Sequence, residues 1–143
     1  MSPQTAQEFS LGLRCGQLLT MKGGLPEILK DQFLGIIGGK IEVIAPLGQG
    51  LWRAREWIWA ENKVVMPGLV NAHTHLAMSL FRGLADDEPF AQWLHGTILP
   101  LEAGLVDADF VRVGTELALL ECIRFGTTSV CDMYYFSDVV ADA

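Results

Sequence analysis

The sequence is poor in charged residues and lacks the long or regular patterns that define several protein classes. Only 19% of its 143 residues are charged and 50% are hydrophobic, so the chain has enough apolar surface to bury and is not expected to be disordered. It has no strict glycine period, no sustained heptad and no stretch near the roughly 20 apolar residues that span a membrane. These absences exclude collagen-like, coiled-coil and membrane-spanning classes, and the length alone corresponds to one domain.

Cysteine is also scarce, with three residues, Cys15, Cys122 and Cys131. An odd number without short paired spacings does not indicate a disulfide framework. Residues 1–10 lack the basic stretch followed by an apolar stretch that is typical of a secretory signal. We therefore expect a reduced, cytoplasmic protein. We also expect Cys122 and Cys131 to lie in the core rather than to be reactive.

Positive charge is rare in the second half of the chain. The net charge is −7, and residues 1–72 hold 7 basic and 6 acidic side chains whereas residues 73–143 hold 3 and 11. An acidic half is a poor electrostatic match for nucleic acid, so we interpret it as a solvated surface. The expected partner is a small-molecule substrate, with no nucleic acid and no membrane, and a homo-oligomer is left open.

Short strands and turns are predicted for residues 1–66. Residues 11–21 form a strand, or a strand pair, interrupted at Gly16, and the pair 38–39 (Gly-Gly) joins strands at 32–37 and 40–44 in a tight hairpin. A further strand covers 52–60. Its Trp57 and Trp59 share one face and are interpreted as core. A turn is expected at residues 61–63. This segment is predicted to be a β-rich unit, about half of a sandwich or roll.

The pattern changes after Pro67. A short buried strand is predicted at 69–73, then a short helix at 90–95 with Asp87 as a candidate N-cap, and then a strand at 127–134. Between the last two, Asp107 caps a long helix that ends at Gly126. Its predicted amphipathic stripe consists of Phe110, Val113, Leu117 and Leu120.

This order of elements predicts the start of a β/α repeat with a parallel sheet, because a strand, a long crossover with a helix and a second strand follow one another. Two parallel strands do not close a sheet and are normally covered on both faces. We therefore expect residues 67–143 to be the beginning of a larger α/β domain.

Two histidines lie where the predicted strand at 69–73 ends, His73 as its last residue and His75 two residues later. Side chains two residues apart on a strand project to one side, so both imidazoles can converge on one cation at about 2.0–2.1 Å for zinc. A bare His-x-His pair has no function in most proteins. Here it follows a buried strand, where an imidazole without a hydrogen bond or a metal costs free energy. The context favours a metal site.

These and further motifs resemble the amidohydrolase superfamily, in the branch of 5-methylthioadenosine/S-adenosylhomocysteine deaminases, s-triazine hydrolases and guanine deaminases. The resemblance begins near Leu18 and is strongest from 66 to 135. The motifs that carry it are VMPGLVNAHTH at 65–75, MSLFRGLADD at 78–87, WL at 93–94, LPLE at 99–102, GTT at 126–128 and DMY at 132–134.

The resemblance implies a metal-dependent hydrolase whose fold is α/β. Residues 1–66 would be the N-terminal share of a small β-sandwich, and residues 67–143 the start of a (β/α)8 barrel of the TIM type. His73 and His75 match the first two ligands of one divalent metal, zinc or alternatively iron. The family takes further histidines and an aspartate from later strands, and the sequence ends before them.

In the adenosine-type branch, a tryptophan and a glutamate line the substrate pocket, and they match Trp93 and Glu102. The glutamate accepts hydrogen bonds from ribose hydroxyls, a task that suits a carboxylate. Without the resemblance, Trp93 is equally explained by helix packing, and Glu102 is better explained as a solvent-exposed loop acid. His95 is interpreted as a helix-capping or surface residue.

Motifs of other enzyme classes are missing. The sequence has no phosphate-binding glycine loop, no Gly-x-Ser-x-Gly elbow and no His-x-Glu with Cys-x-x-Cys pair of the cytidine-type zinc deaminases. The expected activity is hydrolytic deamination of an adenosine derivative by the complete enzyme, with the 143-residue chain inactive alone. The alternatives are a chlorohydrolase or a guanine-deaminase-type member, or a non-catalytic metal-binding or interaction module.

Overall fold

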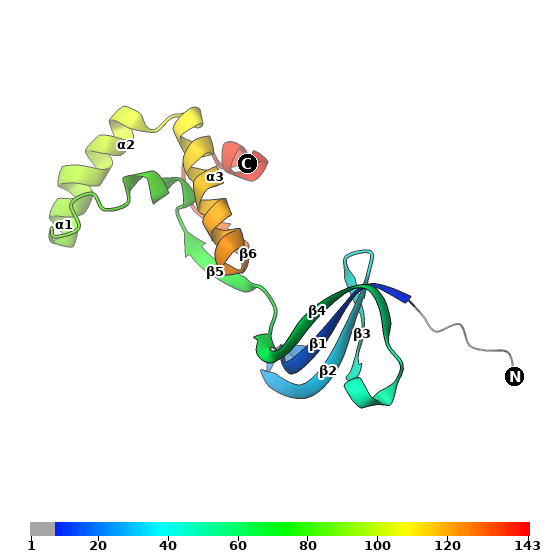
Figure 1. Cartoon of the computed structure of the whole chain (residues 1–143). Helices are drawn as coiled ribbons and strands as arrows, with labels where there is room; N and C mark the ends of the chain where they lie inside the picture. Colours follow the sequence, from blue (N-terminus) through cyan, green and yellow to red (C-terminus); the bar gives the residue numbers. More distant parts are fainter. Residues whose placement is uncertain (1–7) are drawn as a thin grey trace, which may run out of the picture. The chain divides into compact units, whose positions relative to one another are not determined.

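The computed structural model describes residues 8–143, and this part of the backbone divides after Pro67 into two units, the second being Gly68–Ala143 (Figure 1). The first unit is a four-stranded sheet in the order β3-β2-β1-β4. Strand β2 pairs antiparallel with both β1 and β3, whereas β4 runs parallel to β1. The elements are β1 (Glu8–Thr20), β2 (Glu27–Ile37), β3 (Lys40–Pro46) and β4 (Arg53–Val65), with short 3₁₀ turns η1 (Lys22–Gly24) and η2 (Leu47–Gln49).

The predicted hairpin at Gly38 and Gly39 is confirmed. Ile37 pairs with Lys40, which leaves the two glycines as the whole turn. Their φ angles are 58° and 77°. Two consecutive residues with positive φ match the right-handed twist of the flanking strands, and glycine adopts this conformation without steric strain.

The predicted turn at residues 61–63 is wrong, because strand β4 continues through it as a bulge. Cys15 pairs with Ala60 and Gln17 with Val64, so three residues of β4 oppose the single Gly16 of β1. A Cβ on Gly16 would lie 1.8 Å from the carbonyl oxygen of Glu61. The predicted interruption at Gly16 is therefore a bulge site inside one long strand, where only glycine leaves room for the opposing backbone.

The two faces of this sheet bury different clusters. One face buries Cys15, Leu18 and Leu34. On the other, Phe33 is fully buried and stacks on Trp52 with ring centroids 4.5 Å apart. Within residues 8–65 the structure shows one sheet, so the second layer of a sandwich stays a prediction.

The tryptophan pair of β4 is only partly in the core. Trp57 and Trp59 share a face as predicted, with centroids 5.7 Å apart. Trp57 is half-buried against Phe33, but Trp59 is 60% exposed and carries the Arg14 guanidinium over its ring. The interpretation of Trp59 as core is wrong, because no further layer among the described residues covers the edge strand β4.

The second unit contains two parallel strands and a helical crossover, as predicted, and gives the chain a mixed α/β fold. Strand β5 (Leu69–Thr74) pairs with β6 (Thr127–Asp132). The helical elements are the 3₁₀ helix η3 (Leu76–Phe81), α1 (Phe90–Gln92), the π-helical turn η4 (Trp93–Ile98), α2 (Leu99–Leu105), α3 (Ala108–Phe125) and α4 (Ser137–Asp142). In the part of the chain that the structure describes, no helix is long and apolar enough to cross a membrane.

Helix α3 has the predicted caps. The Asp107 side chain accepts a hydrogen bond from the backbone N–H of Phe110 at 2.8 Å, and Gly126 ends the helix with a φ of 81°. An acceptor at the N-cap satisfies one of the free amide groups of the first turn, and a left-handed glycine ends the last.

The predicted apolar stripe of α3 is only partly buried: Phe110 is half-buried, with its ring centroid 4.9 Å from that of Phe81, but the other three members are exposed. Val113, Leu117 and Leu120 are 45%, 40% and 66% exposed. The helix instead buries a neighbouring face with Val111, Gly114, Thr115 and Ala118. Small residues on this face let η3 approach closely: a Cβ on Gly114 would lie 2.5 Å from the carbonyl oxygen of Ala77. Close backbone packing, rather than the number of apolar side chains, selects the buried face.

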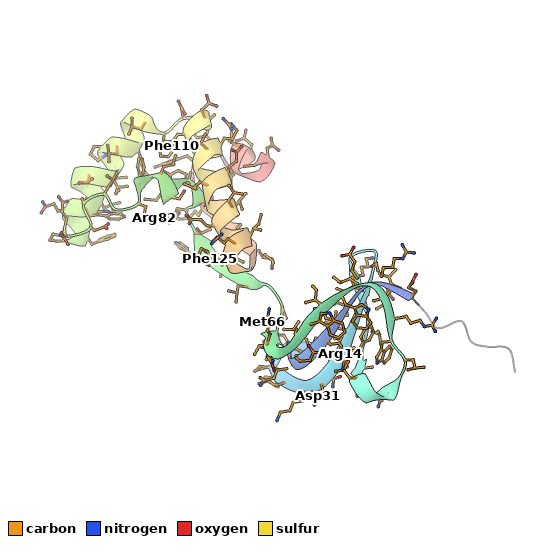
Figure 2. All side chains as sticks on the ribbon, viewed as in Figure 1. Arg14, Asp31, Met66, Arg82, Phe110 and Phe125 are labelled. Atoms are coloured by element: carbon orange, nitrogen blue, oxygen red, sulfur yellow. The ribbon has the colours of Figure 1, made fainter. Side chains whose placement is uncertain are left out.

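A bidentate ion pair also joins η3 to α3. Arg82, labelled in Figure 2, lies just after η3. Its guanidinium donates to both carboxylate oxygens of Glu121 at 2.9 and 2.7 Å. Both side chains are exposed, so water screens the attraction between their charges. The pair therefore orients the two elements more than it stabilises them.

The short helix predicted at 90–95 is longer than expected. It begins after Pro89 with no side-chain cap, so Asp87 is not its N-cap, and it continues as α1, η4 and α2 to Leu105. Pro100 lies in the first turn of α2. Because proline has no N–H to donate to the preceding turn, the regular helix is interrupted there, and the π-helical turn precedes it.

The predicted burial of β5 is wrong in this chain. Val70 is 70% exposed and Leu69 49%, and every residue of β5 before Thr74 is exposed. Among the described residues, β5 and β6 have only each other as partners in the sheet. Cys131 on β6 is exposed for the same reason, against the prediction of a core position, while Cys122 is half-buried. All three cysteines are free.

Candidate active site

The two predicted metal ligands lie side by side where β5 ends. The rings of His73 and His75 have centroids 4.9 Å apart and are nearly perpendicular, at 82°. Thr74 between them takes part in the sheet, and its carbonyl accepts a hydrogen bond from the Met133 N–H at 3.0 Å. The backbone of the parallel pair thus holds the two imidazoles next to each other at the carboxyl edge of the sheet.

A backbone carbonyl determines the hydrogen position on the His75 ring. Nδ1 of His75 lies 2.5 Å from the carbonyl oxygen of Met133. A carbonyl oxygen can only accept, so Nδ1 carries the hydrogen and donates it, and Nε2 is the nitrogen that has a lone pair for a metal in the tautomer so defined. Histidines that bind metals are commonly held in this way, with one nitrogen donating to a carbonyl or carboxylate.

Asp132 supports the same turn. Its Oδ1 accepts a hydrogen bond from the Leu76 N–H at 2.6 Å, directly after His75. The last residue of β6 therefore holds the start of η3 and the chain that leaves the histidine pair. This contact lies between segments 56 residues apart, so only the folded chain brings them together.

The donor set fits part of a zinc-type site. Two neighbouring imidazoles are suitable zinc ligands, and catalytic zinc sites use three protein ligands and a water. Across residues 8–143, no group of three or more His, Cys, Asp or Glu side chains is placed to hold a metal. The described chain thus offers two candidate ligands of such a set.

A cavity of about 530 Å³ lies next to the histidine pair. It brings together three of the four predicted site residues, His75, Trp93 and Glu102, whereas His73 is not among its lining residues. The remaining lining residues are mostly apolar or aromatic: Met78, Phe90, Leu94, Ile98, Met133, Tyr134 and Tyr135. A cavity of this size with few polar groups is typical of a small-molecule site.

The helix that starts at Phe90 supplies one wall of this cavity. Trp93 is the first residue of the π-helical turn, is half-buried, and has its ring centroid 5.9 Å from that of Phe90. Its ring thus serves both helix packing and the cavity wall. His95, on the same turn, is exposed as expected for a surface residue, although it lies inside the helix and not at its end.

Glu102 is half-buried on α2 and is held by a residue whose role the sequence did not reveal. The Tyr134 hydroxyl donates a hydrogen bond to Oε1 of Glu102 at 2.8 Å. Burial, and then the Glu102 carboxylate, raise the pKa of Tyr134 well above its usual value near 10, so the phenol is a protonated donor at neutral pH. One feature of the sequence could have indicated this role. Tyr134 follows the carboxyl end of a predicted parallel strand, where barrel enzymes carry their functional residues.

Comparison with known proteins gives a consistent result. The model of the amidohydrolase family matches residues 64–143. The chain is 48% identical over 112 residues to the 5-methylthioadenosine/S-adenosylhomocysteine deaminase of Syntrophobacter fumaroxidans, a match that covers 77% of this chain and 25% of the relative. It is 45% identical over 131 residues to the 5'-deoxyadenosine deaminase of Methanococcoides burtonii, covering 92% and 29%.

A solved structure has the same fold over nearly the whole chain. The adenosine deaminase of Xanthomonas campestris, with bound zinc, superposes with a TM-score of 0.87 at 35% identity and covers 95% of this chain and 31% of that one. The chain spans between a quarter and a third of the length of these relatives. Because the family model covers more than half of its residues, including the histidine pair and the cavity, the chain belongs to the amidohydrolase family.

Proposed function

We propose that this chain is the N-terminal part of a metal-dependent hydrolase that removes the amino group of an adenosine derivative with water. The observation that carries the proposal is that one cavity brings together His75, Trp93 and Glu102. The ring of His73 lies next to that of His75. The names of the two sequence relatives support the substrate class, because both are deaminases of adenosine-type compounds.

In this proposal His73 and His75 hold one divalent metal. Zinc is favoured because imidazole nitrogens suit it and the similar Xanthomonas campestris structure has bound zinc, and iron is the alternative. When bound, such an ion supplies Lewis acidity that lowers the pKa of water toward about 7. The bond from His75 Nδ1 to Met133 orients one of the two ligands before the metal arrives.

The cavity residues bind and orient the substrate in this proposal. The apolar wall formed by Trp93, Met78 and Phe90 accepts a flat, weakly polar base. Glu102 accepts hydrogen bonds from the sugar hydroxyls, chiefly through Oε2, while Oε1 accepts the bond from Tyr134. The base and sugar are thus placed with the amino-bearing ring carbon toward the histidine pair, which raises the effective concentration of the reacting groups.

The architecture proposed for the whole enzyme follows the same relatives. We place residues 67–143 as the first two strands of a (β/α)8 barrel and residues 1–66 as the N-terminal share of a small β-sandwich. The exposed apolar side chains of β5 support this placement, since strands of a parallel barrel are covered on both faces. The remaining metal ligands, histidines and an aspartate, would come from later strands.

Metal content and ammonia release test this proposal in the full-length enzyme, meaning the natural polypeptide that contains residues 1–143 and completes the length of the relatives. We expect His73→Ala and His75→Ala to lose bound metal, measured by plasma emission, and most deaminase activity. His95→Ala is the matched control, because this exposed histidine lies outside the cavity. Stoichiometric metal in both site variants would show that the ligand assignment is wrong.

The downstream gene sequence and a substrate panel separate the alternatives. Further histidines and an aspartate encoded after codon 143 are expected, and their absence would favour the non-catalytic metal-binding or interaction module. A full-length enzyme that releases chloride from a chlorotriazine, or ammonia only from guanine, would replace the adenosine assignment with one of the other branches.

A further inference from the structure

Tyr134 and Glu102 form a contact that joins two walls of the candidate cavity. Tyr134 follows β6 and Glu102 lies on α2, 32 residues earlier, and the hydroxyl-to-carboxylate distance is 2.8 Å. Both side chains are half-buried and both line the cavity. Among residues 8–143, no protein hydrogen bond to the second carboxylate oxygen, Oε2, is seen. One oxygen of the carboxylate is therefore held by the protein, and the other remains for a ligand.

We propose that Tyr134 is a positioning residue that presents the Glu102 carboxylate to a substrate with neighbouring sugar hydroxyls, and so helps to select nucleosides over sugar-free or deoxygenated compounds. This inference rests on the proposed function. It adds Tyr134 as a residue that acts through Glu102 and does not contact the reacting atoms.

The reason is the freedom of a glutamate side chain. Glutamate has three rotatable bonds, and fixing them on substrate binding opposes the binding free energy. A charge-assisted hydrogen bond from a phenol fixed at the end of a strand restricts these bonds before the substrate arrives. Loss of the hydroxyl should therefore weaken binding of the hydroxyl-bearing substrate by about tenfold and leave the chemical step nearly unchanged.

The ring of Tyr134 packs independently of its hydroxyl. Its centroid lies 5.1 Å from that of Tyr135 and 6.3 Å from that of His75. Tyr134→Phe keeps these contacts and removes one oxygen atom, so the variant is expected to fold. Ser79→Ala is a matched control because the Ser79 hydroxyl donates a comparable bond, 2.9 Å to the Gly114 carbonyl, within the same unit but outside this cavity.

Steady-state kinetics of the full-length enzyme test the proposal with 5'-deoxyadenosine and with its analogue that lacks the 2' and 3' hydroxyls. For Tyr134→Phe we expect KM for 5'-deoxyadenosine to rise about tenfold, kcat to change less than about twofold, and KM for the analogue to stay within about twofold. Glu102→Gln should raise the same KM at least as much. Adding Tyr134→Phe to Glu102→Gln should have a smaller effect than Tyr134→Phe alone, because the charge-assisted bond from the phenol to a carboxylate is already lost in Glu102→Gln. Ser79→Ala should shift neither KM.

The outcomes distinguish this inference from the proposed function. If Tyr134→Phe leaves KM for 5'-deoxyadenosine nearly unchanged, raises both KM values equally, or multiplies the effect of Glu102→Gln, the positioning role is wrong even though Glu102 binds the sugar. If Glu102→Gln does not change the preference for the hydroxyl-bearing substrate, or the wild type deaminates neither compound, the proposed substrate class fails and this inference fails with it.

Discussion

Gly114 provides a direct test of how the second unit packs. A methyl group at this position would clash with a neighbouring element, but it would also favour the helix. An alanine Cβ at this position would lie 2.5 Å from the carbonyl oxygen and 2.9 Å from the Cα of Ala77. Both atoms belong to the backbone of η3, so relief of the clash requires α3 and η3 to move apart. Overpacking of this kind costs about 1–3 kcal/mol.

Helix propensity acts in the opposite direction for the same substitution. Replacing glycine with alanine inside a helix contributes about 1 kcal/mol of stability. Because the clash involves rigid backbone on both sides, we expect it to exceed this gain, with a net loss of up to about 2 kcal/mol for Gly114→Ala. For a unit of the length of Gly68–Ala143, each kcal/mol lost lowers Tm by about 4–8 °C.

Thermal unfolding followed by far-UV circular dichroism measures the effect. Gly104→Ala is the matched control, since a Cβ on this glycine of α2 would have no heavy atom within 4 Å. We expect Gly104→Ala to leave Tm unchanged or raise it slightly. If Gly114→Ala unfolds at the same temperature as Gly104→Ala or above it, α3 does not pack on η3 through this face, and the stripe of Val113, Leu117 and Leu120 would again be the candidate buried face.

Three further predictions concern other parts of the described chain. The Thr115 hydroxyl is fully buried and has no hydrogen-bond partner among the described residues. Thr115→Val should therefore raise the free energy of unfolding, measured in urea, by about 1 kcal/mol. A lower free energy of unfolding would show that the hydroxyl has a partner. Burial raises the pKa of the Cys15 thiol, so a thiol reagent near pH 8 should label the exposed Cys131 first and Cys15 only on unfolding; equal labelling rates in the native chain would contradict the burial. Residues 1–143 alone should release no ammonia from adenosine analogues. They should also self-associate in size-exclusion chromatography, because apolar residues of β5 such as Val70 are exposed. A sharp, active monomer peak would contradict both expectations.

Features that depend on neighbouring residues in the chain were predictable. The hairpin at Gly38 and Gly39, the N-cap of α3 at Asp107 and its end at Gly126 all follow from local dihedral preferences and local hydrogen bonds. The pairing of His73 with His75 belongs to the same class, because the two-residue period of a strand places alternate side chains together. The cavity location of Trp93 and Glu102 came instead from the resemblance to a family, since neither residue has a distinctive local pattern.

The tertiary structure decided the contacts between segments that are far apart in the sequence. Strand β4 continues through residues 61–63 because β1 pairs with it on both sides of Gly16, and no local signal carries that information. The buried face of α3 was set by the close approach of the Ala77 backbone to Gly114, against the larger apolar stripe of the same helix. The bond from Tyr134 to Glu102 likewise joins residues 32 positions apart. Such a hydrogen bond depends on how the strand and the helix pack together, and neither segment's own sequence indicates it.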